Sequence, residues 1–130
     1  MMTQEILLVD DDPIINFINK KVVESAFPHF PIIIFENGYS AIEYIHKNPE
    51  KSFLVFLDLN MPVMNGWEFL EAISHDSNKY NLAIHILTSS VDQSDQNKAN
   101  SYKQVISYLT KPLKKEVLQK IKLPKQTSFD

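Results

Sequence analysis

Five consecutive apolar residues that end on an aspartate constrain the fold of this chain more than any other feature. The run from Phe53 to Leu57 is followed directly by Asp58. Side chains of a strand alternate between its two faces, so an unbroken apolar run predicts a strand that is buried on both faces, as in the centre of a parallel sheet. A carboxylate at the end of such a strand lies at the edge where α/β sheets bind ligands.

Four further apolar segments have the length of strands, and stretches with apolar residues at helical spacing separate them. This alternation predicts a parallel sheet with helices on both faces. With right-handed crossovers, we predict a flavodoxin-like, doubly wound (βα)5 fold with the strand order 2-1-3-4-5. The predicted strands are Ile6–Val9, Ile32–Phe35, Phe53–Asp58, Leu82–Thr88 and Val105–Thr110.

Capping residues and prolines mark the helix boundaries. Asp12 before Pro13 is typical of an N-cap with proline at the first helical position. From Ile14 to Ala26 apolar residues keep helical spacing, until Pro28 ends the helix. The later helices are predicted from Gly38 to Asn48, from Trp67 to Ile73, from Asp92 to Asn100 and from Leu113 to Ile121.

Composition argues against several classes of function. The chain has 130 residues, a net charge of −3, no cysteine and no arginine. Arginine dominates the bidentate recognition of guanine and phosphate, so its absence argues against direct nucleic-acid binding. No apolar run approaches the ~20 residues of a membrane span, and the absence of cysteine fits a reducing cytoplasm. We expect a single cytoplasmic domain over residues 1–130, ordered from about 4 to 122 and with a tail at 124–130.

Polar side chains collect at the carboxyl ends of the predicted strands. Asp10 and Asp11 follow the first strand, and Asp58 ends the third. Thr88 ends the fourth strand, and Lys111 follows the fifth. Because these ends share one edge of a parallel sheet, we expect three carboxylates, a hydroxyl and an ammonium in one crevice.

This group of side chains predicts a metal-assisted phosphoryl acceptor. Clustered carboxylates raise one another's pKa unless a cation balances them. A few carboxylates with open coordination positions suit Mg²⁺ better than Ca²⁺. Beside such a metal, Asp58 can stay ionised and attack an electrophilic phosphorus. Lys111 would balance charge on the transferred group, and Thr88 would hydrogen-bond one of its oxygens.

The segments that carry these residues resemble the response-regulator receiver (CheY-like) domain of the stand-alone type. The resemblance covers about residues 4 to 122. It implies a phosphoprotein of two-component phosphorelay signalling, in which Asp58 becomes a 4-aspartylphosphate. The phosphoryl donor would be a sensor histidine kinase or a histidine phosphotransfer protein, and the protein would signal through a conformational change. The matching segments are Ile6–Pro13, Leu57–Gly66, Leu87–Ser90 and Tyr108–Pro112.

The resemblance also implies a role for each residue of the crevice. Asp11 would bind magnesium directly, and Asp10 would act mainly through water. Asp58 would also contact the metal, and Asn60 would bind it through its backbone carbonyl. The remaining implied residues are Thr88 and Lys111 as holders of the phosphoryl group, Tyr108 as an aromatic switch, and Pro112 in a cis peptide bond with Lys111.

Two other functions compete with this interpretation. A phosphatase of the haloacid-dehalogenase kind needs a second aspartate two residues after the nucleophile, where this chain has Asn60. A receiver-shaped scaffold that works without phosphate would be favoured by loss of Asp58 or Lys111, and both are present. We therefore expect a signalling domain that accepts a phosphoryl group, and not an enzyme.

The C-terminal third predicts where a downstream protein docks. The segment from Asp92 to Asn100 has few apolar residues, so its helix should be able to shift. The last twenty residues are rich in lysine, which favours an acidic partner on the face formed by about residues 91–122. The lysines in question are residues 111, 114, 115, 120, 122 and 125.

Overall fold

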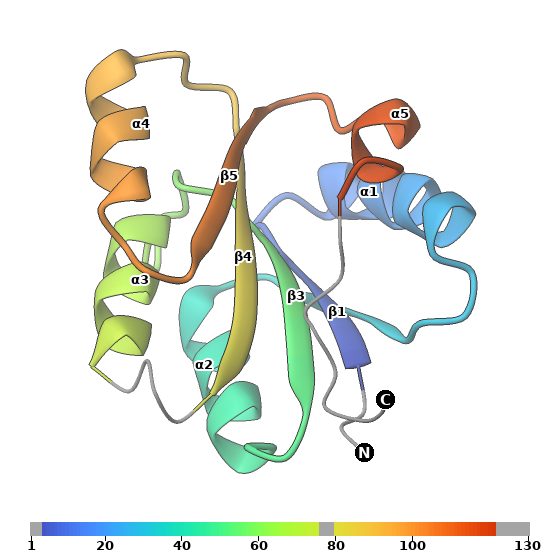
Figure 1. The fold of residues 1–130 in the computed structure, drawn as a ribbon, viewed down its shortest axis with the longest axis horizontal. Helices are drawn as coiled ribbons and strands as arrows, with labels where there is room; N and C mark the ends of the chain where they lie inside the picture. Colours follow the sequence, from blue (N-terminus) through green and yellow to red (C-terminus); the bar gives the residue numbers. More distant parts are fainter. Residues whose placement is uncertain (1–3, 76–79, 122–130) are drawn as a thin grey trace.

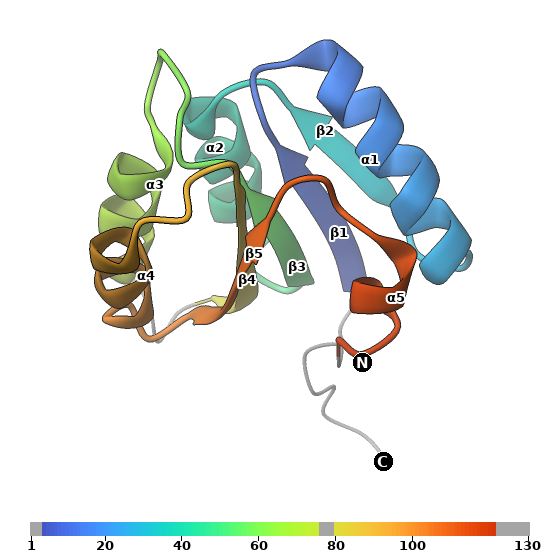
Figure 2. The ribbon, with the colours of Figure 1, turned by 90° about the horizontal axis from the view of Figure 1, so that it is seen from above.

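A computed structural model describes residues 4–75 and 80–121, in which five parallel strands form one sheet in the order β2-β1-β3-β4-β5 (Figures 1 and 2). The predicted flavodoxin-like fold is therefore confirmed, whereas the tail at 124–130 lies outside the described residues. The strands are β1 (Gln4–Val9), β2 (Ile32–Phe35), β3 (Ser52–Leu57), β4 (Asn81–Thr88) and β5 (Val105–Thr110). The helices are α1 (Pro13–Ala26), α2 (Gly38–Lys47), α3 (Gly66–Ser74), α4 (Gln93–Asn100) and α5 (Lys115–Leu118).

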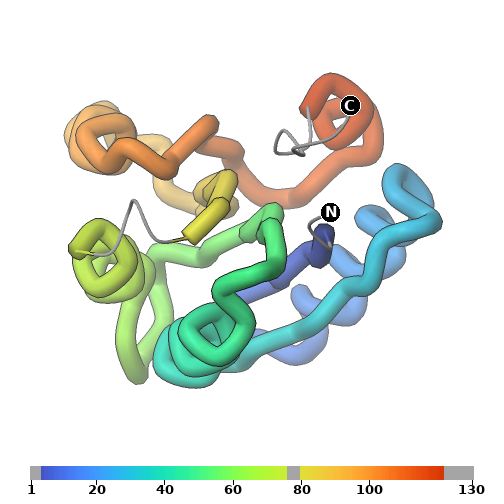
Figure 3. The backbone as a smooth tube through the Cα atoms, turned by 60° about the horizontal axis from the view of Figure 1, so that its bottom comes forward, coloured from blue at the N-terminus to red at the C-terminus, as the bar shows by residue number. Residues whose placement is uncertain are grey.

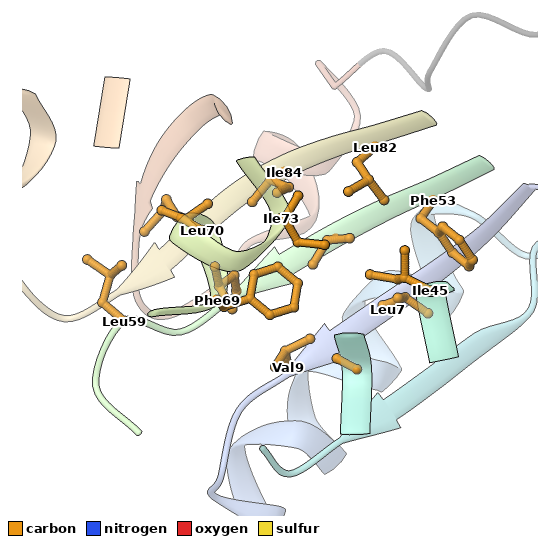
Figure 4. Close-up of a cluster of buried hydrophobic side chains, with 14 of the residues drawn as sticks. Leu7, Val9, Ile45, Phe53, Leu59, Phe69, Leu70, Ile73, Leu82 and Ile84 are labelled. Atoms are coloured by element: carbon orange, nitrogen blue, oxygen red, sulfur yellow. The ribbon is translucent and has the colours of Figure 1, made fainter. Parts of the chain in front are cut away.

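Helices cover both faces of the sheet, which explains the unbroken apolar run of β3. Figures 2 and 3 show α1 and α5 on one face, and α2, α3 and α4 on the other. Along β1, Leu7 and Val9 pack toward α2 and α3 in the larger core, which Figure 4 shows. Ile6 and Leu8 pack on the opposite side, with side chains from α1 and α5.

The N-terminal half of helix α1 buries polar residues and exposes apolar ones, so the apolar spacing there does not mark the buried face. Asn16 is 1% exposed and Asn19 is 6% exposed, whereas Ile14 is 70% and Ile18 is 49% exposed. The helix begins at its N-cap Asp12, whose side chain accepts hydrogen bonds from two N–H groups of the first turn. The two asparagines lie on the face that packs against the sheet.

Helix α3 begins close against the end of the central strand. Asn65 and Glu68 form a capping box, in which each side chain accepts a hydrogen bond from the other residue's backbone N–H. A Cβ atom at Gly66 would lie 2.7 Å from both the carbonyl oxygen of Asp58 and the Cα of Leu59. Only glycine permits this approach, so the start of α3 supports the backbone that carries Asp58.

Helix α4 has the thin apolar face that the sequence predicts. Ala99 is its one buried residue in the described structure. Beside it, the Lys98 ammonium lies 4.4 Å from the centre of the Trp67 ring on α3. Helix α5 has four residues and is shorter than the predicted segment that ends at Ile121. In the described part of the chain, no helix has both the length and the apolar character needed to cross a bilayer.

Candidate functional site

The carboxylates of the predicted site meet at the carboxyl ends of two neighbouring strands. Val9 of β1 pairs with Leu57 of β3, and Asp10 and Asp58 follow these residues. Asp10 is 4% and Asp58 is 5% exposed, whereas Asp11 is exposed. One oxygen of each of the three carboxylates lies within 4.8 Å of the others. The structure therefore brings together the three acids that the sequence singles out.

Lys111 reaches this cluster from the loop after β5. Its backbone N–H donates to the carbonyl oxygen of Thr88 over 2.8 Å, which ties the loop to the end of β4. The Lys111–Pro112 peptide bond is cis, as predicted. The Lys111 Nζ lies 2.8 Å from Asp10 Oδ2 and 3.6 Å from Asp58 Oδ2. The ammonium thus provides the positive charge between the two buried carboxylates.

Burial and mutual repulsion act on the charges of this cluster. Burial, together with the negative charge of Asp10, raises the pKa of the Asp58 carboxyl, although Lys111 opposes the shift. Burial also disfavours the ammonium of Lys111. Its hydrogen bond to Asp10 and the charge of Asp58 outweigh that cost, so the pKa of Lys111 is raised. Asp58 is therefore a basic carboxylate, and more cationic charge nearby would favour its ionised form.

The two buried carboxylates differ in how firmly they are held. Both oxygens of Asp10 are engaged, one by the backbone N–H of Asp12 at 2.9 Å and the other by Lys111 at 2.8 Å. Asp58 accepts a longer hydrogen bond from the backbone N–H of Asn60, at 3.3 Å. Asp58 consequently keeps acceptor capacity, as a nucleophile requires.

A hard divalent cation fits this set of side chains. Carboxylate oxygens are the ligands that Mg²⁺ and Ca²⁺ prefer, and three of them converge here. Among the described residues, Asp11 is exposed and its carboxylate accepts no hydrogen bond, unlike that of Asp10. Asp11 is therefore the acid most available for direct coordination of a metal, because one oxygen of Asp10 is already bonded to Lys111.

Ser90 connects the crevice to two other elements through three different atoms. Its backbone N–H donates to the hydroxyl of the buried Thr88 over 3.3 Å. Its carbonyl oxygen accepts a hydrogen bond from the Tyr108 hydroxyl on β5, at 3.2 Å. Its own hydroxyl donates to Asp95 in the first turn of α4, at 2.9 Å. The predicted switch residues Thr88 and Tyr108 are thus joined through one serine.

Sequence reasoning missed Asn16 as part of this region. The Asn16 side chain donates to the carbonyl oxygen of Asp10 over 2.7 Å, and Asn16 lines a small cavity beside Asp58. The available signal was the spacing of three and four residues between Asn16, Asn19 and Val23, which puts them on one helical face. That signal was hidden because the neighbouring isoleucines have the same periodicity.

Comparisons with known proteins agree with this geometry. The model of the family described as "Response regulator receiver domain" matches residues 6–122. The chain is 29% identical to the chemotaxis protein CheY of Halobacterium salinarum over 88% of this chain and 89% of that protein. It is 31% identical to the 3',5'-cyclic-nucleotide phosphodiesterase regA of Dictyostelium discoideum over 88% of its length, but spans only 14% of that protein. A two-component response regulator from Cytophaga hutchinsonii has a similar structure, with a TM-score of 0.77 and 30% identity over 91% of this chain and 92% of that one.

Proposed function

The chain belongs to the response regulator receiver domain family of two-component signalling, and we propose that Asp58 is the residue that accepts the phosphoryl group. The observation that carries this proposal is the position of Asp58 within the acid cluster. It is a buried carboxylate at the end of the central strand, clustered with Asp10 and Asp11 and 3.6 Å from the Lys111 ammonium.

In the proposed reaction, an oxygen of Asp58 forms a bond to phosphorus while the bond between phosphorus and the donor imidazole nitrogen breaks. The imidazole leaves with the electron pair of that bond. Lys111 faces the oxygens of the transferred group as a point charge, and the Thr88 hydroxyl donates to one of them. The raised pKa of Asp58 makes its carboxylate a better nucleophile once it is ionised.

We propose magnesium as the cation of this site. Asp11 and Asp58 would hold it through carboxylate oxygens, Asn60 through its backbone carbonyl, and Asp10 mainly through water. A bound magnesium ion supplies positive charge that offsets the charge on the phosphoryl oxygens. The exposed position of Asp11 and the firm engagement of Asp10 support this division of roles.

We propose that the chain is a phosphoacceptor and not a phosphatase. A hydrolase of the haloacid-dehalogenase kind uses a second aspartate as a general acid, and the corresponding position holds Asn60. An amide cannot donate a proton as a carboxylic acid does. The family itself is one of signalling domains, which supports the same conclusion.

The exposed apolar face of α1 is our candidate docking surface for the phosphodonor protein. Ile15 and Ile18 of α1 line a groove of about 320 Å³ together with Lys111 and Pro112, so the surface adjoins the crevice. A partner seated on it would hold its phosphohistidine near Asp58. The partner class is a sensor histidine kinase or a histidine phosphotransfer protein.

Ile18→Ser should slow transfer from a phosphorylated histidine phosphotransfer protein by about tenfold, because it removes an apolar contact of the docking face. Phosphorylation by acetyl phosphate, which needs no docking, should keep its rate. The matched control is Tyr39→Ser, which removes an exposed ring from α2. Equal slowing with both phosphodonors would show that Ile18 acts on the site and not on docking.

The output surface is proposed to comprise α4, β5 and α5, within about residues 91–122. Ser90 links Thr88 in the crevice to Tyr108 on β5 and to Asp95 on α4. A phosphoryl group that draws Thr88 toward it would alter all three contacts together. Such differential contacts can bias a two-state surface, as the thin apolar face of α4 allows. Of the C-terminal lysines that the sequence singles out, residues 111, 114, 115 and 120 are described; Lys122 and Lys125 lie outside the described residues.

Chemical-shift mapping with beryllofluoride and magnesium tests the output surface. Outside the crevice, we expect the largest changes between Thr88 and Ile121, because the hydrogen bonds of Ser90 lead there. Binding of an acidic partner to this face should weaken as salt concentration rises. Changes confined to α1 would place the output surface elsewhere.

We also propose that residues from about 4 to 122 form one receiver domain that works in the cytoplasm. The family match over residues 6–122 supports these limits. The absence of cysteine supports a reducing compartment.

A further inference from the structure

A small cavity lies next to Asp58, between α1 and the carboxyl ends of β1, β3 and β4. Its volume is about 10 Å³, which is about the space that one water molecule needs. The apolar residues that line it on the sheet side are Leu8, Val9, Phe56 and Leu87. The polar residues that line it are Asp10, Asn16, Asn19 and Asp58.

Asn16 brings an unpaired oxygen to this region. Its Nδ2 donates to the carbonyl oxygen of Asp10 over 2.7 Å, and this bond fixes which end of the amide is nitrogen. The Oδ1 atom is buried and has no hydrogen-bond partner among the described residues. A buried acceptor of this kind is costly unless a donor reaches it, and water is the usual donor.

Asp58 is the less firmly held of the two carboxylates that line the cavity. Both Asp10 oxygens already accept short ones, at 2.9 and 2.8 Å. The contacts of Asp58 are longer, 3.3 Å to the backbone N–H of Asn60 and 3.6 Å to Lys111. Since Asn16 Oδ1 and the Asp58 carboxylate are both acceptors, a group between them must donate twice. Water is a double donor of the right volume.

We propose that Asn16 is a positioning residue for Asp58 and acts through one internal water, which donates to Asn16 Oδ1 and to the Asp58 carboxylate. This inference rests on the proposed role of Asp58 as phosphoacceptor. The water restrains the carboxylate from the α1 side, and it offsets part of the cost of burying its charge. It also gives a reason for α1 to turn an asparagine toward the sheet while Ile14 and Ile18 are exposed.

Two substitutions at Asn16 separate this role from a merely structural one. Asn16→Leu keeps the branching of the side chain at Cγ but is larger and apolar, so its methyl groups fill the cavity and exclude the water. Asn16→Ala leaves room for water to replace the amide, so Asp58 keeps a hydrogen-bond donor. Both lose the bond to Asp10, so the loss of that bond cannot account for a difference between them. Phosphorylation by acetyl phosphate with magnesium should be about tenfold slower in the leucine variant than in the wild type, with alanine in between.

A merely structural role predicts the opposite order, because alanine leaves the larger void and leucine buries more apolar surface. Val23→Ala is the matched control: Val23 is a fully buried residue of α1 that does not line the cavity. This variant should lower the melting temperature and leave the phosphorylation rate unchanged. A leucine variant as fast as the wild type overturns the inference.

The water itself is a second readout that does not depend on phosphorylation. A high-resolution crystal structure should show it within hydrogen-bond distance of Asn16 and Asp58 in the wild type. It should be absent from the leucine variant. A wild-type structure without this water overturns the inference even where Asp58 is phosphorylated. Conversely, a wild type that shows the water but takes up no phosphoryl group contradicts the proposed function and leaves the water bridge in place.

Discussion

Asp58→Asn is expected to abolish phosphoryl uptake. Incubation with acetyl phosphate and magnesium should raise the intact mass of the wild type by one phosphoryl group and leave the mass of the variant unchanged. The reason is that an amide has no anionic oxygen to attack phosphorus, whereas the geometry around the site is otherwise kept. Mass spectrometry of the intact proteins measures the effect directly.

Asp12→Asn is the matched control for this experiment. Asp12 belongs to the same acidic segment, but its side chain caps α1, and asparagine caps helices about equally well. This variant should be phosphorylated like the wild type. An undiminished mass increase in the Asp58 variant would mean that another residue is the acceptor.

The same Asp58 substitution should stabilise the protein in the absence of divalent metal. Burial and the charge of Asp10 raise the pKa of Asp58, so the ionised carboxyl costs stability in the folded state. That cost is fully present above the raised pKa and disappears as the pH falls below the ordinary carboxyl value. Thermal unfolding in a chelator should therefore give the variant its largest advantage at neutral pH and none in strong acid.

Lys111→Met should lower the rate of phosphorylation by acetyl phosphate by about 100-fold or more, as loss of a charge that stabilises a transition state typically does. Methionine keeps much of the apolar stem but removes the ammonium that lies 2.8 Å from Asp10 and 3.6 Å from Asp58. The two buried carboxylates then lack their nearest counter-charge, and the pKa of Asp58 should rise further. Initial rates at saturating magnesium measure the loss.

Thermal unfolding provides an independent readout for Lys111. Without metal, the variant should be less stable than the wild type by about 1–2 kcal/mol, a value reduced from that of a fully buried pair because Lys111 is partly exposed. The difference should narrow as the pH falls and the carboxylates take up protons. Added magnesium should stabilise the variant more than the wild type. Lys120→Met, at an exposed position on the same C-terminal segment, should leave rate and stability unchanged.

Strand ends made the candidate site predictable from the sequence. Parallel strands place their carboxyl ends on one edge, so residues that follow separate apolar runs must lie near one another. Asp10, Asp11, Asp58 and Lys111 meet in this way, although up to 101 positions separate them along the chain. Their convergence needed no knowledge of side-chain packing, because the alternation of strand and helix was enough to set it.

The sequence by itself thus determined the order of the sheet, the N-cap of α1 and the acids of the crevice, all of which follow from local patterns and chain connectivity. Only the tertiary structure decided which face of α1 is buried, since Asn16 and Ile18 obey the same helical period and packing against the sheet selects between them. It also decided that Lys111 lies closer to Asp10 than to Asp58, and that Ser90 joins the crevice to α4. These contacts depend on distances between side chains of different elements, and no pattern within a single element encodes such distances.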